Sequence, residues 1–432
     1  MYIILGYGVT GIAVQHFLEQ HGENYYIYDS QAISTPELQK YIIHSPPYNN
    51  TNIKGIVVSP GISTQYNVNV QKPEWQFIEY ARNNQIPIIS DIQLFIEFYP
   101  NKQYIALTGT NGKSTTATLV YEICKQAEIN VSLSGNIGVS PCKNAINSQV
   151  CILEISSFQL EITNNIQFEL STIINITPDH LTQYKTLEEY TKTKLKIINL
   201  SKNCIINHNI PHSNQNTIEF STTKECQGYS LQKNKILFCN EEIASLPPTY
   251  IPHENILSAF GICHQFGIDP TIIINTISQF KGIEHRLEFV TEIDGVKFYN
   301  DSKATNIHST HNALKTLKGH NIFLIAGGKL EDEITDIFSI PEFHNIQMIG
   351  LIGSASGTIS KELITHNTKS SKKIKYCLYG NIEKALPLLF QEAKKLESAV
   401  IILSPFCKSF DQFQNFIERG LAFKKYTLAL KE

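Results

Sequence analysis

The chain has 432 residues, which at about 150 residues per domain predicts roughly three domains. Hydrophobic residues make up 42% and charged residues 17%, a composition that supports buried cores and excludes a disordered chain. The formal net charge is −3, which excludes a protein held on nucleic acid by bulk positive charge. On this charge we expect no nucleic-acid partner. The sequence has no run of 18 apolar residues, so we expect no membrane insertion.

The first twenty residues do not resemble a secretory signal, because they lack a basic start and glycines interrupt their apolar run. The nine cysteines are scattered and form no CxxC pair. An odd, unpaired set suits a reducing compartment better than a disulfide framework. We therefore expect a cytoplasmic protein.

Short apolar runs alternate with amphipathic stretches, which is the pattern of α/β domains with parallel sheets. We divide the chain into units 1–90, 91–283 and 284–432, with a break expected near 91–103. The predicted strands are Tyr2–Leu5, Tyr25–Tyr28, 55–59, 86–89, 104–107, 151–154, 171–175, 296–299, 322–326, 348–352 and Ala399–Leu403. The predicted helices include 11–21, 187–200 and 254–266, residues 200–250 are expected to form hairpins, and 361–375 a solvated surface.

A glycine-rich turn, GxGxxG at residues 6–11, follows the first predicted strand and precedes the first helix. Asp29 ends the second strand, where it suits a ribose hydroxyl. One interpretation is NAD binding. The other is a Rossmann-like fold that binds another nucleotide, or none.

A phosphate loop is predicted at Thr108–Thr115, TGTNGKST, between a strand and a helix. Backbone N–H groups and the helix N-terminus would cradle phosphates, Lys113 would reach them, and Ser114 or Thr115 could bind Mg²⁺. Leu107 stands where the strict pattern has glycine, so the loop is a variant.

Two further strand ends carry reactive side chains. Glu154 ends one strand and His180 follows the next. Because the carboxyl ends of parallel strands share one sheet edge, we expect both beside Lys113, with Glu154 placed to bind Mg²⁺. Lys194 lies in a predicted helix, and its pattern does not separate it from Lys192 or Lys196.

Several motifs together resemble the Mur ligases, ATP-dependent peptide synthetases of cell-wall assembly, over nearly the whole chain. They are TGTNGKST (108–115), LEISSFQLE (153–161), NITPDHL (175–181), YTKTKLKI (190–197), HRLEF with FYNDSKATN (285–306) and LSPFCKSFDQFQNFIERG (403–420). The second and the last two are most similar to members that add D-glutamate to UDP-N-acetylmuramoyl-L-alanine. The resemblance implies a monomer with a Rossmann-like N-terminal domain, a P-loop ATPase-like central domain and a Rossmann-like C-terminal domain.

The resemblance also implies roles for individual residues. The UDP end of the substrate would contact Val9, Thr10, Ser30 and Ser59, and Asn136 its muramoyl-alanine part. ATP would contact Gly109, Thr110, Asn111, Gly112, Lys113, Ser114, Thr115, Asn255, Arg286 and Asp301.

Two Mg²⁺ ions would be held by Ser114, Glu154, His180 and a carbamylated Lys194. The catalytic set would be Lys113, Glu154, His180 and Lys194.

D-Glutamate would be held by Lys303, Thr305, Ser409 and Phe416. The family commonly has a GGxDK-type turn after the strand at 322–326, and this chain has Gly327-Gly328-Lys329 without the aspartate. The implied reaction phosphorylates the L-alanine carboxylate and joins it to the amine of D-glutamate.

Three other functions remain open from the residues. A sister amino-acid ligase would keep the central motifs and change the third unit. An NAD-dependent dehydrogenase would explain only the first glycine turn. A non-catalytic nucleotide-binding protein would need the phosphate loop but not Glu154 and His180.

Overall fold

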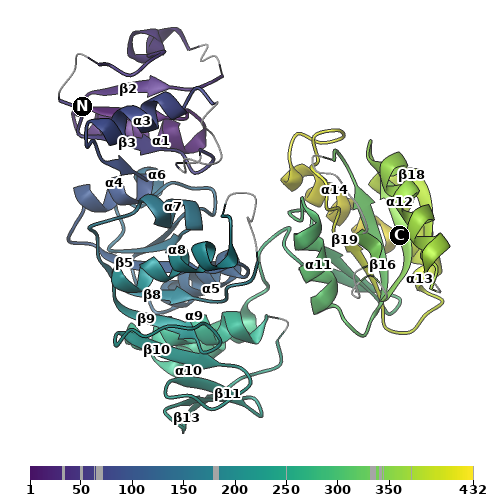
Figure 1. Cartoon of the computed structure of the whole chain (residues 1–432). Helices are drawn as coiled ribbons and strands as arrows, with labels where there is room; N and C mark the ends of the chain where they lie inside the picture. The colour runs from purple at the N-terminus through teal and green to yellow at the C-terminus, as the bar shows by residue number, and fades with distance from the viewer. Residues whose placement is uncertain are drawn as a thin grey trace. The chain divides into compact units, whose positions relative to one another are not determined.

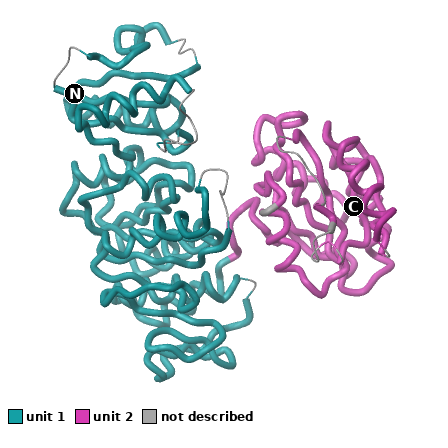
Figure 2. Tube along the Cα trace, in the orientation of Figure 1, with its two compact units in different colours: residues 1–280 teal, residues 281–432 magenta. Residues whose placement is uncertain are grey.

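The computed structural model divides the chain into two compact units, residues 1–280 and 281–432, drawn in teal and magenta in Figure 2. Three sheets dominated by parallel strands give an α/β fold, as the sequence predicts. The structure describes residues 1–31, 35–48, 52–62, 64, 72–178, 184–249, 251–330, 337–339, 343, 345–370 and 372–431, without the side chain of His308.

The first sheet is parallel throughout and has the strand order β2-β1-β3-β4. Its strands are β1 (Tyr2–Leu5), β2 (Tyr25–Tyr28), β3 (Gly55–Val58) and β4 (Ile88–Ile89). Its helices are α1 (Val9–Gln20), the 3₁₀ helix η1 (Pro36–Tyr41) and α3 (Trp75–Asn83). Alternate residues of β1 face opposite sides: Ile4 packs in one core cluster with α1, and Ile3 in another with α3.

The second sheet has nine strands in the order β13-β12-β11-β10-β9-β8-β5-β7-β6, and only β12 runs antiparallel to its neighbours. Its strands are β5 (Gln103–Thr108), β6 (Val131–Gly135), β7 (Val150–Glu154), β8 (Phe168–Ile173), β9 (Ser201–Asn207), β10 (Thr217–Ser221), β11 (Tyr229–Gln232), β12 (Lys235–Phe238) and β13 (Glu241–Ser245). The helices of this part are α4 (Asp91–Phe98), α5 (Lys113–Gln126), α6 (Pro141–Asn144), α7 (Ser157–Ile162), α8 (Leu187–Asn199), α9 (His253–Gln265) and α10 (Pro270–Gln279), several of which Figure 1 labels.

The third sheet, in the second unit, has the order β14-β15-β19-β16-β17-β18, with only β14 antiparallel. Its strands are β14 (Glu288–Ile293), β15 (Val296–Asn300), β16 (Asn321–Gly327), β17 (Ile346–Ile352), β18 (Lys375–Gly380) and β19 (Ala399–Leu403). The helices are α11 (Ile307–Thr316), η2 (Ile337–Ser339), α12 (Ser356–Lys369), α13 (Ile382–Ala393), α14 (Phe416–Leu428) and η4 (Ala429–Lys431). Separate hydrophobic clusters cover the two faces of this sheet.

Helix α4 occupies much of the stretch 91–103 in which a break is expected. The hydroxyl of Ser90 caps the helix by accepting a hydrogen bond from the Gln93 N–H at 3.1 Å. The apolar residues that follow are buried, and Phe95 lies in one core cluster with Phe17 of α1 and Tyr104 of β5. The first two sheets therefore share a core, and the three-domain boundaries stay a prediction.

Other strands differ from the sequence-based expectation in smaller ways. Strand β8 is shifted toward the N-terminus, because Ile174 and Asn175 leave the ladder to contact the phosphate loop. The expected hairpins in 200–250 are confirmed as the antiparallel β11–β12–β13 ladder. Strands β6, β14 and β18 were not predicted.

Within the described residues, no helix combines the length and the apolar character that crossing a membrane requires.

The glycine turn at residues 6–11 gives a matched pair of substitutions. A Cβ at Gly11 would lie 2.2 Å from the carbonyl oxygen of Gly6, whereas a Cβ at Gly8 would meet nothing within 4 Å. We predict that Gly11→Ala destabilises the fold by about 1–3 kcal/mol, because the backbone must move, whereas Gly8→Ala, at the N-cap of α1, costs less, about 0.5–1 kcal/mol. Urea unfolding of both variants tests this, and equal effects would contradict it.

Candidate active site

The phosphate loop lies between β5 and α5, as predicted. Gly112 caps the helix with a left-handed φ of 81°, and Lys113 is its first residue. The Lys113 ammonium folds back over the loop, where Nζ donates to the carbonyl oxygens of Gly109 at 2.8 Å and Thr110 at 2.9 Å. The loop is thus closed around a cation at the positive end of a helix, an arrangement suited to phosphate.

The residues after β8 hold the loop in this shape. The Thr110 N–H donates to the Asn175 carbonyl at 2.9 Å, and the Asn111 N–H donates to Asn175 Oδ1 at 2.9 Å. Asn175 Nδ2 donates in turn to Glu254 Oε2 of α9 at 3.2 Å. Sequence reasoning missed Asn175, although its position at the end of a buried strand and at the head of the NITPDHL motif was a usable signal.

Lys194 is separated from its neighbours by burial. Its side chain is 1% exposed, whereas Lys192 is exposed and Lys196 half-buried. Lys194 Nζ donates to the Gly109 carbonyl at 2.9 Å and lies 4.8 Å from the ring centre of Tyr190. The structure therefore brings Lys194 to the phosphate loop, which the helix pattern alone could not indicate.

Tyr190 connects this helix to the loop. Its hydroxyl lies 3.3 Å from Thr110 Oγ1, and its ring packs against Tyr184. Thr110 Oγ1 also accepts from the Thr177 N–H at 3.0 Å. The loop is therefore supported on the side of α8 and on the side of β8.

Glu154 ends β7 next to the loop, because Leu107 of β5 pairs with it in the parallel ladder. Its side chain is 2% exposed, and Oε1 accepts a hydrogen bond from Asn136 Nδ2 at 3.2 Å. Oε2 is buried and has no hydrogen-bond partner among the described residues. A buried carboxylate oxygen left open in this way fits a divalent cation or another donor.

The remaining residues of the predicted ATP site are placed as follows. A Cβ at Gly112 would lie 2.3 Å from Asn255 Oδ1, so Asn255 packs against the loop. Ser114 is buried in the first turn of α5, and Thr115 follows it half-buried. His180 lies outside the described residues, so its predicted place beside Glu154 stays a prediction.

The first glycine turn uses Asp29 internally. Asp29 Oδ2 accepts from the Tyr7 N–H at 2.6 Å, and Oδ1 accepts from the Gln31 N–H at 2.7 Å. The carboxylate thus braces the turn.

The predicted UDP-binding residues surround this turn. Val9 and Ser30 are exposed and Thr10 is half-buried, while Ser59 Oγ donates to the Gly6 carbonyl at 2.8 Å. They lie at the N-terminus of α1 and at the ends of β2 and β3.

In the second unit, Asp301 is buried at the end of β15. Its Oδ1 accepts from the Leu287 N–H at 3.0 Å, and its Oδ2 accepts from Ser404 Oγ at 2.7 Å. Burial raises the pKa of Asp301 to about 7, although these hydrogen bonds and Arg286 oppose the shift. Asp301 therefore fixes the backbone beside Arg286, where Leu287 has a left-handed φ of 45°.

The predicted amino-acid residues lie partly together. Lys303 Nζ is 5.5 Å from the ring centre of Phe416, and Ser302 Oγ donates to the Phe416 carbonyl at 2.8 Å. Ser409 is buried, and Thr305 is half-buried before α11.

The turn without the family aspartate is joined to the same region. The Lys329 N–H donates to the Lys408 carbonyl at 2.8 Å, and the Lys408 N–H donates to the Lys329 carbonyl at 2.9 Å. The Gly327-Gly328-Lys329 turn therefore meets the 403–420 segment at one end of the third sheet, and the FYNDSKATN segment meets it there through Ser302 and Phe416. The Lys329 side chain is exposed.

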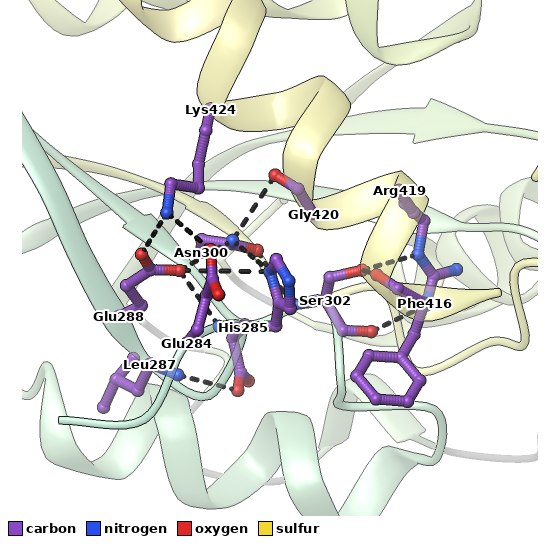
Figure 3. Close-up of polar contacts among 11 residues, drawn as sticks. Glu284, His285, Leu287, Glu288, Asn300, Ser302, Phe416, Arg419, Gly420 and Lys424 are labelled. Carbon is purple, nitrogen blue, oxygen red and sulfur yellow. Dashed lines mark hydrogen bonds and ion pairs between the residues drawn. The ribbon is translucent and has the colours of Figure 1, made fainter.

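Glu284, His285 and Glu288 bring possible metal-ligand atoms within 4.8 Å of one another. Figure 3 shows that other groups already contact both carboxylates: Lys424 Nζ lies 2.9 Å from Glu284 Oε1 and 2.6 Å from Glu288 Oε1. Asn300 Nδ2 donates to Glu288 Oε2 at 3.0 Å and lies 2.9 Å from His285 Nδ1. We interpret this cluster as an ion-pair network that anchors the HRLEF segment.

The buried carboxyl of Asp301 gives a pH-dependent stability. Its pKa of about 7 lies above the ordinary 3.8, so the folded state binds more protons, and this contribution to stability is lost as pH rises from about 4 to 7. We compare the free energy of unfolding of Asp301→Asn with that of the wild type, as measured by urea unfolding. We predict that this difference favours the variant more at pH 8 than at pH 5, because the wild type must bury a charged carboxylate at pH 8. The Ser404 hydroxyl can accept from the new amide, because it can donate to Thr310 Oγ1 at 2.9 Å.

The matched control is Asp294→Asn, since Asp294 is exposed in the same unit. The stability of this control relative to the wild type should be the same at pH 5 and pH 8. If the stability difference between Asp301→Asn and the wild type were the same at both pH values, the prediction would be contradicted.

Comparison with known proteins shows the family of this chain. The family model of the Mur ligase middle domain matches residues 107–245. The UDP-N-acetylmuramoylalanine–D-glutamate ligase of Caldicellulosiruptor bescii is 31% identical, over 98% of this chain and 96% of its own. The enzymes of the same name from Caldanaerobacter subterraneus (33%; 99% and 98%) and Rickettsia bellii (32%; 97% and 95%) are equally similar.

Among solved structures, the UDP-N-acetylmuramate–alanine ligase of Thermotoga maritima aligns with a TM-score of 0.60 at 15% identity, over 99% of both chains. A type C pseudomurein peptide ligase of Methanothermus fervidus aligns with a TM-score of 0.56 at 16% identity, also over 99% of both. These two likenesses concern the fold. Identity above 30% across nearly the full length establishes the family, and the chain belongs to the Mur ligases.

Proposed function

We propose that this chain is an ATP-dependent ligase that adds D-glutamate to UDP-N-acetylmuramoyl-L-alanine in the cytoplasm, a step of peptidoglycan precursor synthesis. The observation that carries the proposal is the 31–33% identity to D-glutamate ligases over 97–99% of the chain. The substrate assignment is part of this proposal. It also draws on the second unit, where two of the three motifs most similar to those enzymes meet.

The reaction requires activation of a carboxylate. A carboxylate is a poor electrophile because oxide would be its leaving group, and transfer of the γ-phosphoryl of ATP to it gives an acyl phosphate and ADP. The amine of D-glutamate then attacks the carbonyl carbon, the C–O bond to phosphate breaks, and the amine loses a proton as the amide forms. Such a sequence depends mainly on positioning and on neutralising phosphate charge.

The phosphate loop supplies that neutralisation in the proposal. Lys113 would exchange its contacts with the Gly109 and Thr110 carbonyls for phosphate oxygens. The N-terminal amides of α5 and the amide of Asn255 would add donors around the same phosphates. Arg286 and Asp301 of the second unit are assigned to the nucleotide, with Asp301 fixing the Arg286 backbone.

Mg²⁺ is consistent with the residues present. The unpartnered Oε2 of Glu154 is a hard oxygen ligand, and Ser114 offers a hydroxyl at the start of α5. A carbamate on the buried Lys194 would turn a cation into a second oxygen ligand, and His180 completes the proposed set. When bound, Mg²⁺ would neutralise phosphate charge.

The first sheet is assigned to the UDP end of the substrate rather than to NAD. Both carboxylate oxygens of Asp29 accept backbone N–H groups, which favours a bracing role over a ribose contact. Val9 and Thr10 lie in the first turn of α1, where N–H groups without a side-chain cap suit a diphosphate. Ser30 and Ser59 follow the neighbouring strands β2 and β3, and Asn136 is assigned to the muramoyl-alanine part.

We assign residues 1–90 to the UDP substrate, 91–283 to ATP and 284–432 to the amino acid. The change of compact unit after Phe280 supports the last boundary. In the third part, Lys303 would supply positive charge for a carboxylate, and Thr305, Ser409 and Phe416 would line the pocket.

The direct test is release of ADP and phosphate with Mg²⁺-ATP, UDP-N-acetylmuramoyl-L-alanine and single amino acids. We expect release only when both the UDP substrate and D-glutamate are present. Release with another amino acid would keep the ligase chemistry and overturn the D-glutamate assignment. Nucleotide binding without release under any combination would favour a non-catalytic protein.

Lys194 and Lys192 form a matched pair on α8. We predict that Lys194→Ala lowers kcat by about a hundredfold or more, because it removes a buried group at the phosphate loop. Lys192→Ala should retain activity within about twofold, because that lysine is exposed. Equal losses in the two variants, measured with the same ADP-release assay, would refute the role assigned to Lys194.

A further inference from the structure

Arg419 of α14 is a buried cation that no step of the proposed reaction uses. Its side chain is 1% exposed and belongs to the largest fully buried side chains of the described part of the chain. Burial lowers the pKa of Arg419 to about 10, so the guanidinium stays protonated near neutral pH. A buried charge of this kind is costly unless its hydrogen-bond donors are well used.

The guanidinium donates hydrogen bonds to two segments that are distant in sequence. Nε donates to Ser302 Oγ at 3.0 Å and Nη2 to the Ser302 carbonyl at 2.8 Å (Figure 3). Nη1 donates to the Cys407 carbonyl at 3.0 Å. All three acceptors are neutral oxygens, and no carboxylate of the described residues hydrogen-bonds to this side chain. Among the described residues, Arg419 therefore forms no buried ion pair.

Two further contacts extend this arrangement. Ser302 Oγ in turn donates a hydrogen bond to the Phe416 carbonyl at 2.8 Å, so one hydroxyl joins Arg419 to the first residue of α14. A Cβ at Gly328 would lie 3.1 Å from Arg419 Nη1 and 2.2 Å from the Lys408 carbonyl oxygen. The guanidinium thus lies directly beneath the Gly327-Gly328 turn as well.

Three of the four segments held in this way carry or flank a residue of the proposed amino-acid pocket, and the fourth is the Gly327-Gly328 turn. Lys303 follows Ser302, Ser409 lies two residues after Cys407, Lys329 follows Gly328, and Phe416 is itself in the network. These segments come from the ends of β15, β16 and β19 and from the start of α14. Arg419 is a contact that these segments share, in addition to the paired amides of Lys329 and Lys408 and the Ser302–Phe416 hydrogen bond.

We propose that Arg419 is a positioning residue for the amino-acid pocket, whose guanidinium fixes the segments carrying Lys303, Ser409 and Phe416 relative to one another. The inference rests on the proposed function in treating this pocket as the amino-acid site. It adds that the grip on the amino acid depends on a residue beneath the pocket that does not touch it. Only arginine presents donors in a planar fork that can reach both Ser302 and Cys407, so lysine should not replace it.

The variants Arg419→Lys and Arg419→Gln test this in the full-length enzyme. Both should raise the KM for D-glutamate by about tenfold or more, as expected for losing hydrogen bonds from a charged group, and leave the KM for ATP within about twofold. Ser302→Ala should give a smaller rise of the same kind, because the other contacts of Arg419 remain. Lys395→Gln, an exposed ion-pair residue of the same unit, is the matched control and should change neither constant.

A second readout does not depend on which amino acid the enzyme uses. The paired amides of Lys329 and Lys408 should exchange hydrogen at least about tenfold faster in Arg419→Lys, while amides of α13 keep their wild-type rates. Suppose that exchange at these amides is faster in the variant, and that the wild-type enzyme turns over a different amino acid in place of D-glutamate. That result would uphold the inference and reject the D-glutamate assignment.

Two results would overturn the inference. One is a D-glutamate KM and loop exchange that both stay at wild-type values in Arg419→Lys and Arg419→Gln. The other is a uniform change, in which the KM for ATP rises with that for D-glutamate and exchange accelerates throughout the second unit. That pattern would show a general structural role.

Discussion

The pairing of β5 with β7 on one side and β8 on the other is the constraint on which the candidate site of the first unit depends. Leu107 pairs with Glu154 and Thr108 with Ile173 in these parallel ladders. The phosphate loop, the buried carboxylate and the Asn175 segment therefore leave the sheet at one level and one edge. A slip of one residue in either ladder would turn these groups to the wrong face.

Two lysine side chains donate hydrogen bonds to a single carbonyl oxygen of the phosphate loop. Lys113 and Lys194 come from different helices, and both donate to the oxygen of Gly109, at 2.8 and 2.9 Å. Two cations gathered around one neutral oxygen repel each other, and the repulsion is strong where water is partly excluded. An anion bound at the loop would relieve this repulsion, and so would the proposed carbamate on Lys194, because it replaces a positive charge with oxygen ligands.

The second unit relies on a different device, a set of buried polar groups at the carboxyl ends of β15 and β19. Asp301 joins the Leu287 backbone to Ser404, and Arg419 joins Ser302 to Cys407. Both side chains are buried and both hold backbone that carries other candidate residues. Geometry in this unit is thus set by hydrogen bonds to main-chain groups, which specify direction more tightly than apolar packing does.

The sequence alone determined the α/β class, the two glycine-rich turns and most parallel strands, because apolar runs and Gly-Lys-Ser spacing are local signals. It missed α4, β6, β14 and β18, where short elements are half-exposed or lie next to turn residues. Tertiary structure alone decided which helix lysine is buried, since Lys192, Lys194 and Lys196 look alike until α8 packs on the loop. It also decided that Asp29 braces a turn and that Arg419 lies beneath three segments, because such contacts join residues far apart in the chain and leave no periodic trace.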